Sequence, residues 1–157
     1  MSSTVSIADL IEEYSQGPSL LESSTKGLTD SQLDALPVAG TWSIRQIVAH
    51  TMHMDAVACD RMTRMISENT PLLVNVDEDA AIAGRLYEGL PLVTMLSLFR
   101  LNREIMTHIF KTRPQVDFAR VGVHTHAGLI TVQSVMEKYV KHLKHHLPFI
   151  EKKRQMV

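Results

Sequence analysis

The chain has 157 residues, enough for one domain that buries a core without a stabilising cross-link. Its 16 basic and 17 acidic side chains are interspersed and give a formal net charge of −1, so no basic patch of the kind that binds nucleic acid is present. Cys59 is the only cysteine, which excludes an intramolecular disulfide and favours a reducing compartment.

The N-terminal residues carry no export signal. Met1-Ser2-Ser3-Thr4 lacks a basic region followed by an apolar one, and no segment approaches the roughly 20 apolar residues of a membrane span. We therefore expect a cytoplasmic protein, a single domain over residues 1–157, with neither a nucleic acid nor a membrane as partner.

Helical periodicity of apolar residues dominates the chain, which predicts an all-α protein. A first helix is expected from about Ile7 to Gly27, and Gly17-Pro18 should bend or interrupt it. A short helical piece is expected around residues 31–35. The apolar stripe of the first helix is predicted to comprise Ile7, Leu10, Ile11, Tyr14, Leu20 and Leu21.

Ser43 and Gln46 form a capping-box pair, so a second long helix should start at Ser43 and continue to about Glu68. Residues 74–88 suggest a loop with a short helix. Pro91 is placed as the first residue of a third helix that runs to about Lys111. The third helix is predicted to bury Leu92, Met95, Leu96, Phe99, Ile105, Met106 and Ile109.

Pro114, Gly122 and Gly128 should break any helix before residue 130, and residues 121–124 could pair briefly as extended chain. Thr131 is the predicted N-cap of the last helix. Its apolar positions follow the i, i+3, i+4, i+7 pattern: Val132, Val135, Met136, Tyr139, Leu143, Leu147 and Ile150. Four long amphipathic helices pack most simply as a four-helix bundle.

Three histidines are predicted to face the interior of this bundle. His142 and His146 lie about 40° apart on the buried side of the last helix, and His50 lies at the edge of the buried side of the second helix. His145 falls outside the buried sector, and His53 is a border case.

Buried imidazoles can be satisfied by ordinary hydrogen bonds, but each needs two partners, and helix backbones offer few. A divalent ion shared by His50, His142 and His146 would satisfy one nitrogen of each. The HExxH motif of zinc proteases is absent, because Leu143 stands where the catalytic glutamate would be. A protease is therefore excluded.

Two segments carry a family resemblance. Trp42-Ser43-Ile44-Arg45-Gln46-Ile47-Val48-Ala49-His50 and Tyr139-Val140-Lys141-His142-Leu143-Lys144-His145-His146 resemble the signatures of the DinB-like (DinB/YfiT) family of metal-dependent enzymes. The resemblance implies a four-helix bundle in up-down-down-up order, often dimeric, with nickel or zinc held by residues matching His50, His142 and His146. This sequence departs from the family pattern at His53, where the family usually has aspartate, and at Lys141, where the family often has an aromatic residue.

Characterised relatives of this family use the metal to activate a low-molecular-weight thiol. The resemblance therefore implies a thiol S-transferase that acts on an electrophilic substrate, as a homodimer. Two alternatives stay open: a hydrolase that uses metal-bound hydroxide, and a stress-induced metal-binding bundle without catalysis. Three protein ligands leave positions open for water or substrate, which is typical of catalytic sites.

Most of the other candidate residues have more than one interpretation. His53 is a possible proton shuttle, fourth ligand or solvated histidine, whereas Cys59 is interpreted as a packing residue because it is rotated about 180° from His50 on an ideal helix. His124 and His126 either border the pocket or belong to a mobile surface loop, which we favour. Arg45 and Arg61 are expected either to bind a substrate carboxylate or to form salt bridges within the bundle.

Overall fold

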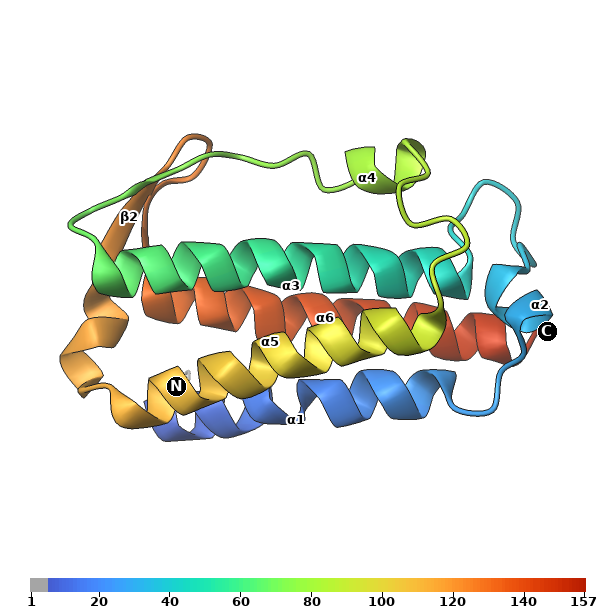
Figure 1. Ribbon diagram of the computed structural model, residues 1–157, viewed down its shortest axis with the longest axis horizontal. Coiled ribbons are helices and arrows are strands. Elements are labelled where there is room, and N and C mark those ends of the chain that lie inside the picture. Colours follow the sequence, from blue (N-terminus) through green and yellow to red (C-terminus); the bar gives the residue numbers. More distant parts are fainter. Residues whose placement is uncertain (1–5) are drawn as a thin grey trace, which may run out of the picture.

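The computed structural model describes residues 6–157, so the predicted absence of an export signal at Met1–Thr4 lies outside the described residues. Four long helices lie side by side along the longest axis of the molecule (Figure 1). They are α1 (Ile7–Thr25), α3 (Ile44–Ser67), α5 (Leu92–Thr112) and α6 (Val132–Arg154). The structure confirms the predicted four-helix bundle.

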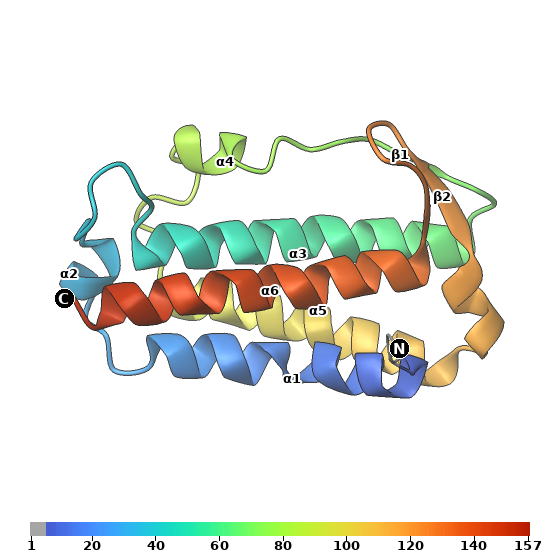
Figure 2. The ribbon, with the colours of Figure 1, turned by 180° about the vertical axis from the view of Figure 1, so that it is seen from behind.

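The helices follow the up-down-down-up order. α1 and α6 run in one direction, and α3 and α5 run in the other (Figures 1 and 2). α1 and α3 each pack against both α5 and α6, so α1 and α3 occupy opposite corners of the bundle. This order requires a long connection from the end of α3 back to the start of α5, and residues 68–91 provide it along the outside of α3.

The connections contain short elements. They are α2 (Asp30–Asp34), β1 (Leu72–Leu73), α4 (Ala80–Ala83), the 3₁₀ helix η1 (Gln115–Ala119), β2 (Val121–His124) and β3 (Gly128–Thr131). β2 pairs in parallel with β1 and antiparallel with β3. Gly122 allows close packing at β2, because a Cβ atom there would lie 2.7 Å from Cδ1 of Leu73 and force that side chain to move. The sheet thus fixes the crossover connection to the segment that leads into α6.

Two predicted helix starts are confirmed by their caps. The Ser43 hydroxyl accepts a hydrogen bond from the Gln46 amide at 3.2 Å, and the Gln46 side chain accepts one from the Ser43 amide at 2.8 Å. Thr131 caps α6 in the same way, with Ser134 as its reciprocal partner. Each box satisfies amides that a helix start leaves without partners.

Two residues predicted to be buried are exposed. Leu20 is 43% exposed and Ile105 is 58% exposed. On α5 the buried face instead comprises Met95, Phe99, Arg103, Met106 and Phe110. The prediction for Ile105 was wrong because it assumed that only apolar residues face the core, whereas Arg103 takes an interior position and Ile105 turns outward.

Gly17 and Pro18 do not divide the first helix. α1 continues through both residues, and Figure 2 shows an irregular ribbon near the middle of this helix. Gly17 lets α5 and α6 pack closely against α1, because a Cβ atom at this position would lie 3.1 Å from Cδ2 of Leu143 and 3.3 Å from Nη1 of Arg103. Of the two predicted outcomes, a bend or an interruption, the structure excludes the interruption, because neighbouring helices stabilise the segment.

None of the helices within residues 6–157 combines the length and apolar character needed to cross a membrane.

Candidate metal centre

The structure brings three histidines together between α3 and α6. His50 Nε2 lies 3.0 Å from His142 Nε2, and His146 Nε2 lies 3.2 Å from the same atom. One nitrogen from each ring falls within 4.8 Å of the others. His142 and His146 are one helical turn apart on α6, as the i, i+4 spacing predicts, and antiparallel packing sets His50 of α3 opposite them.

A backbone carbonyl orients the His50 ring. Its Nδ1 lies 2.9 Å from the carbonyl oxygen of Glu78, which can only accept a hydrogen bond. Nδ1 of His50 therefore carries the proton, and in the neutral ring Nε2 presents a lone pair to the cluster. Glu78 belongs to the crossover connection, so this segment fixes the tautomer of a histidine on α3.

Protons alone do not satisfy the three nitrogens. If His142 Nε2 donates its proton to His50, it has no lone pair left for His146 Nε2, which lies 3.2 Å away. A cation accepts all three lone pairs at once. With metal–nitrogen bonds of roughly 2.0–2.1 Å, ligands at tetrahedral or right angles lie about 2.9–3.4 Å apart, and both observed nitrogen–nitrogen distances fall within this range. The three residues therefore fit a divalent ion.

The surroundings keep the imidazoles neutral. Burial lowers the pKa of His142 to about 3, and the neighbouring His146 and His50 act in the same direction. Burial also lowers the pKa of His146 to about 4, with His50 adding to the effect, and lowers the pKa of His50. Neutral rings with free lone pairs are the form that binds metal.

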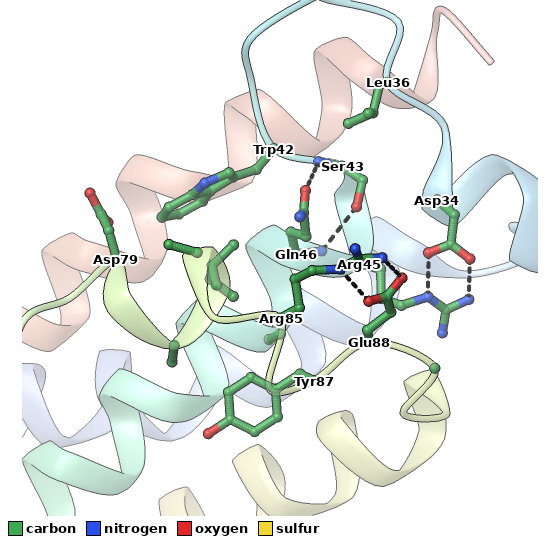
Figure 3. Close-up of a pocket in the computed structure, with 15 residues that line it drawn as sticks. Asp34, Leu36, Trp42, Ser43, Arg45, Gln46, Asp79, Arg85, Tyr87 and Glu88 are labelled. Atoms are coloured by element: carbon green, nitrogen blue, oxygen red, sulfur yellow. Dashed lines mark hydrogen bonds and ion pairs between the residues drawn. The ribbon is translucent and has the colours of Figure 1, made fainter.

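Trp42 forms a wall of the cluster. Its ring centroid lies 4.8 Å from that of His50 and 6.5 Å from that of His146. On the same side of the bundle, an open pocket of about 850 Å³ lies between the start of α3 and the segment around α4 (Figure 3). Trp42, Ala49 and Asp79 line this pocket next to the histidines, so a small molecule has room beside the cluster.

His53 lies outside the three-histidine cluster. Its Nδ1 is 2.6 Å from the hydroxyl of Tyr87, which also lines the pocket. A fourth-ligand role for His53 finds no support in this arrangement, whereas the interpretation as a proton shuttle stays a prediction.

His124 is not part of a mobile surface loop, and that preference was wrong for this residue. It is buried in β2, and its Nδ1 accepts hydrogen bonds from the backbone amides of His126 and Ala127 at 3.2 and 3.1 Å. His126 is exposed. The hairpin that carries both residues lies toward the end of the bundle where α6 begins, away from the pocket in Figure 3 (Figure 1).

The two arginines and the cysteine differ in their environments. Arg45 donates to Asp34 and Asp30, both at 2.6 Å, so its charge is used within the bundle. Arg61 contacts no carboxylate within the described residues and donates to the Val74 carbonyl. Cys59 packs against the hydrophobic core, as expected for a packing residue, and burial raises its pKa to about 12, which keeps it a protonated thiol.

Glu78 is a site residue that sequence reasoning missed. Its carbonyl binds His50, its carboxylate pairs with Lys138 at 3.1 Å, and its charge acts to raise the pKa of His146. No local pattern identifies it, because it stands in an irregular segment 28 residues after His50. Only the path of the crossover brings it to the cluster.

Comparison with known proteins finds a family and relatives that match most of the chain. The model of the DinB superfamily matches residues 13–150. A protein of Oceanobacillus iheyensis, named as a proposed metal-dependent hydrolase, is 28% identical over 92% of this chain and 83% of its own length. The Bacillus subtilis protein YfiT, with the same proposed activity, is 27% identical over 89% of this chain and 79% of its own length.

A solved structure of YfiT from Bacillus subtilis has the same fold. It superposes with a TM-score of 0.88 at 24% identity and covers 99% of this chain and 91% of that chain. It is described as a four-helix bundle of unusual topology, in agreement with the up-down-down-up order seen here.

Proposed function

Since this chain belongs to the DinB superfamily, we propose that it is a divalent-metal-dependent enzyme whose ion is held by His50, His142 and His146. The observation that carries the proposal is the convergence of three Nε2 atoms from two helices, with separations of 3.0 and 3.2 Å along the cluster. The names of the relatives from Oceanobacillus iheyensis and Bacillus subtilis, which state metal dependence, agree with it.

Three histidine ligands leave coordination positions free, which distinguishes a catalytic centre from a structural one. When bound, the ion would supply the Lewis acidity that lowers the pKa of a thiol or a water molecule placed in a free position. The chain's own contribution is to hold the three lone pairs in place. Trp42 shields one side of the cluster, and the pocket of about 850 Å³ offers room for the reacting molecule.

We propose that the nucleophile is a low-molecular-weight thiol and that the reaction transfers its sulfur to an electrophilic substrate. Three neutral imidazoles leave the full positive charge of the ion available to a thiolate, which favours a soft anionic ligand. Cys59 cannot replace an external thiol, because burial raises its pKa to about 12. The ion is proposed to be nickel or zinc, both of which accept imidazole ligands.

Hydrolysis is the second candidate, and Glu78 favours it. A hydrolase needs a base near the attacking water. The Glu78 carboxylate lies near enough to His146 for its charge to act on the pKa of that ring, and Lys138 holds it at 3.1 Å. The relatives named above are assigned as hydrolases. A metal-binding bundle without catalysis is the outcome if neither reaction occurs.

We further propose that the protein forms a homodimer through the outer face of α5. Leu98, Leu101 and Ile105 form an apolar stripe there and are 43%, 46% and 58% exposed. Exposed apolar stripes of this kind mark protein–protein contacts.

The reaction is tested with protein reconstituted with nickel or zinc, offered a panel of small thiols together with an alkylating electrophile. Consumption of one thiol beyond the rate without protein supports the transferase, and the same assay with His142→Gln should return to that background rate. If the protein holds its full complement of metal and consumes none of the thiols, the transferase proposal is refuted.

The hydrolase is tested separately with ester and amide substrates. Glu78→Gln keeps the backbone carbonyl that binds His50 and removes only the carboxylate charge. We expect this variant to lose hydrolysis by roughly 10²–10⁴-fold if Glu78 is the base, while metal content stays unchanged. Equal hydrolysis by wild type and Glu78→Gln would exclude Glu78 as the base.

A further inference from the structure

Arg61 is a buried cation without a counter-ion. It is 6% exposed, and its guanidinium makes one hydrogen bond, from Nη2 to the Val74 carbonyl at 3.0 Å. No carboxylate of residues 6–157 lies within ion-pair distance of it, although the two other buried arginines, Arg45 and Arg103, each bind an aspartate. A buried charge in this state is costly, and a partner of opposite charge would stabilise it.

Tyr139 adds a second unsatisfied group beside Arg61. The residue is 1% exposed, and its hydroxyl lacks a hydrogen-bond partner in the part of the chain that the structure describes. Burial raises the pKa of Tyr139 to about 12, and the nearby Arg61 guanidinium opposes that effect. The hydroxyl is therefore protonated, and its O–H is free to donate to an incoming acceptor.

His124 is a third donor in the same neighbourhood. Its Nδ1 accepts hydrogen bonds from two backbone amides, so the neutral ring carries its proton on Nε2. Burial lowers the pKa of His124, and the positive charges of Arg61 and Lys138 add to the effect. Arg61, Tyr139 and His124 thus each offer a donor, and none of them is paired with a carboxylate within residues 6–157. The acidic residues that act on Tyr139, Glu78 and Asp55, are paired with Lys138 and Arg103.

Tyr139 lies next to the histidine cluster. The Tyr139 ring packs edge-on against the His142 ring with centroids 5.7 Å apart, and the two residues are less than one turn apart on α6. The crossover connection spans both places, because Val74 contacts Arg61 and Glu78 contacts His50. A ligand bound at the histidines therefore lies next to Tyr139, and an extended arm that follows the crossover connection would lead from the histidines toward Arg61.

We propose that Arg61 and Tyr139, with His124 beside them, form an anion subsite that receives a carboxylate. Resting on the proposed function, the subsite selects thiols or electrophiles that carry a carboxylate at a fixed distance from the reacting atom. A guanidinium and a hydroxyl supply matched donors for the two oxygens of that group.

The subsite is first tested without metal. Sodium acetate is titrated into metal-free protein while the Nε–H resonance of each arginine is followed by NMR, with Arg61 assigned from its loss in Arg61→Gln. We expect a saturable shift of Arg61, weakened in Tyr139→Phe, while the carboxylate-paired Arg45 and Arg103 serve as internal controls and stay unmoved. An unchanged Arg61 resonance would overturn the subsite.

The link to the metal is tested with nickel-loaded protein and ω-mercaptocarboxylic acids of increasing chain length, each compared with its methyl ester. Binding is followed by the nickel–sulfur absorption. We expect one chain length to bind roughly tenfold more tightly as the acid, and the difference to vanish in Arg61→Gln. Lys141→Gln removes an exposed cation beside His142 and should leave the ratio unchanged.

The outcomes separate the two proposals. Equal binding of acid and ester at every length, with normal nickel–sulfur absorption, overturns the substrate role of the subsite and leaves the thiol proposal standing. Absence of nickel–sulfur absorption with every thiol contradicts the thiol proposal, whereas a saturable acetate shift at Arg61 then still supports the anion subsite.

Discussion

Arg103 donates a hydrogen bond from Nη1 to the carbonyl oxygen of Tyr14 at 3.2 Å. Tyr14 precedes Pro18 by four residues, and because proline has no amide proton, this carbonyl has no helical donor. A side chain from α5 thus replaces the hydrogen bond that Pro18 removes from α1. The same guanidinium donates to Asp55 at 2.6 Å and to the Tyr139 carbonyl at 3.2 Å, so one residue links all four long helices.

Replacing Arg103 by methionine should lower the free energy of unfolding by about 3–5 kcal/mol, because it leaves the Asp55 carboxylate buried without a partner. Urea denaturation measures the change. The matched control is Arg100→Met on the same helix, whose exposed pair with Glu104 contributes less than about 1 kcal/mol. Similar losses for both variants would contradict a special role of the buried pair.

His142→Gln should abolish stoichiometric binding of nickel or zinc while leaving the helical circular dichroism spectrum unchanged. His142 Nε2 is the atom shared by both short contacts of the cluster, so its loss separates the other two ligands. Elemental analysis after gel filtration measures the metal content. His145→Gln, an exposed neighbour on α6, should bind as much metal as the wild type, and equal metal content in both variants would refute the ligand set.

The metal-free protein should lose stability as the pH falls from about 6.5 toward 4. The pKa of His146 is lowered to about 4 and that of His142 to about 3, whereas a histidine in the unfolded chain has a pKa of about 6.5. In that window the unfolded state binds more protons, so acidification favours unfolding.

Chemical denaturation in the presence of a chelator, at several pH values, measures this dependence. The variant His142→Gln/His146→Gln should show a flatter profile between pH 6.5 and 4. Burial raises the pKa of Asp55 to about 6, which acts with the opposite sign but is common to both proteins and cancels in the comparison. Identical profiles would show that the lowered histidine pKa values do not contribute.

A charge in the apolar stripe of α5 should prevent the proposed dimer. We expect Leu101→Glu/Ile105→Glu to elute as a monomer with unchanged helical content, because both side chains project from the bundle. Light scattering coupled to gel filtration measures the mass. Val116→Glu places the same charge at another exposed apolar residue and should leave the mass of the wild type unchanged, whereas a monomeric wild type would refute the dimer.

Local sequence patterns were sufficient to predict the four long helices. Ser43 and Thr131 were identified as N-caps because a short hydroxyl at a helix start must serve the first free amides, and the structure shows both capping boxes. The i, i+4 spacing likewise placed His142 and His146 on one face of α6. These features depend on residues within a few positions of one another, so no tertiary information was needed.

The missed burial of Arg103 and the absence of an interruption at Pro18 share one physical cause. Arg103 was not assigned to the core because a buried cation is unfavourable until Asp55 and two carbonyls from other helices surround it, and these lie far away in sequence. The interruption that Pro18 was predicted to cause, as the alternative to a bend, is absent for the same reason. In both cases an unfavourable free energy, of a buried charge or of an unpaired carbonyl, is offset by hydrogen-bonding groups from other helices that only tertiary packing brings near.

The sequence by itself determined the helices, their caps and the three candidate ligands, because helical period and capping are set by short-range sterics and hydrogen bonding. Only the tertiary structure decided that His50 meets His142 and His146 with a carbonyl of Glu78 behind it, and that Arg61 and Tyr139 are both buried without a carboxylate partner among the described residues. Those relationships depend on the antiparallel packing of α3 on α6 and on the path of the crossover between α3 and α5. Both are set by contacts between residues far apart in the chain.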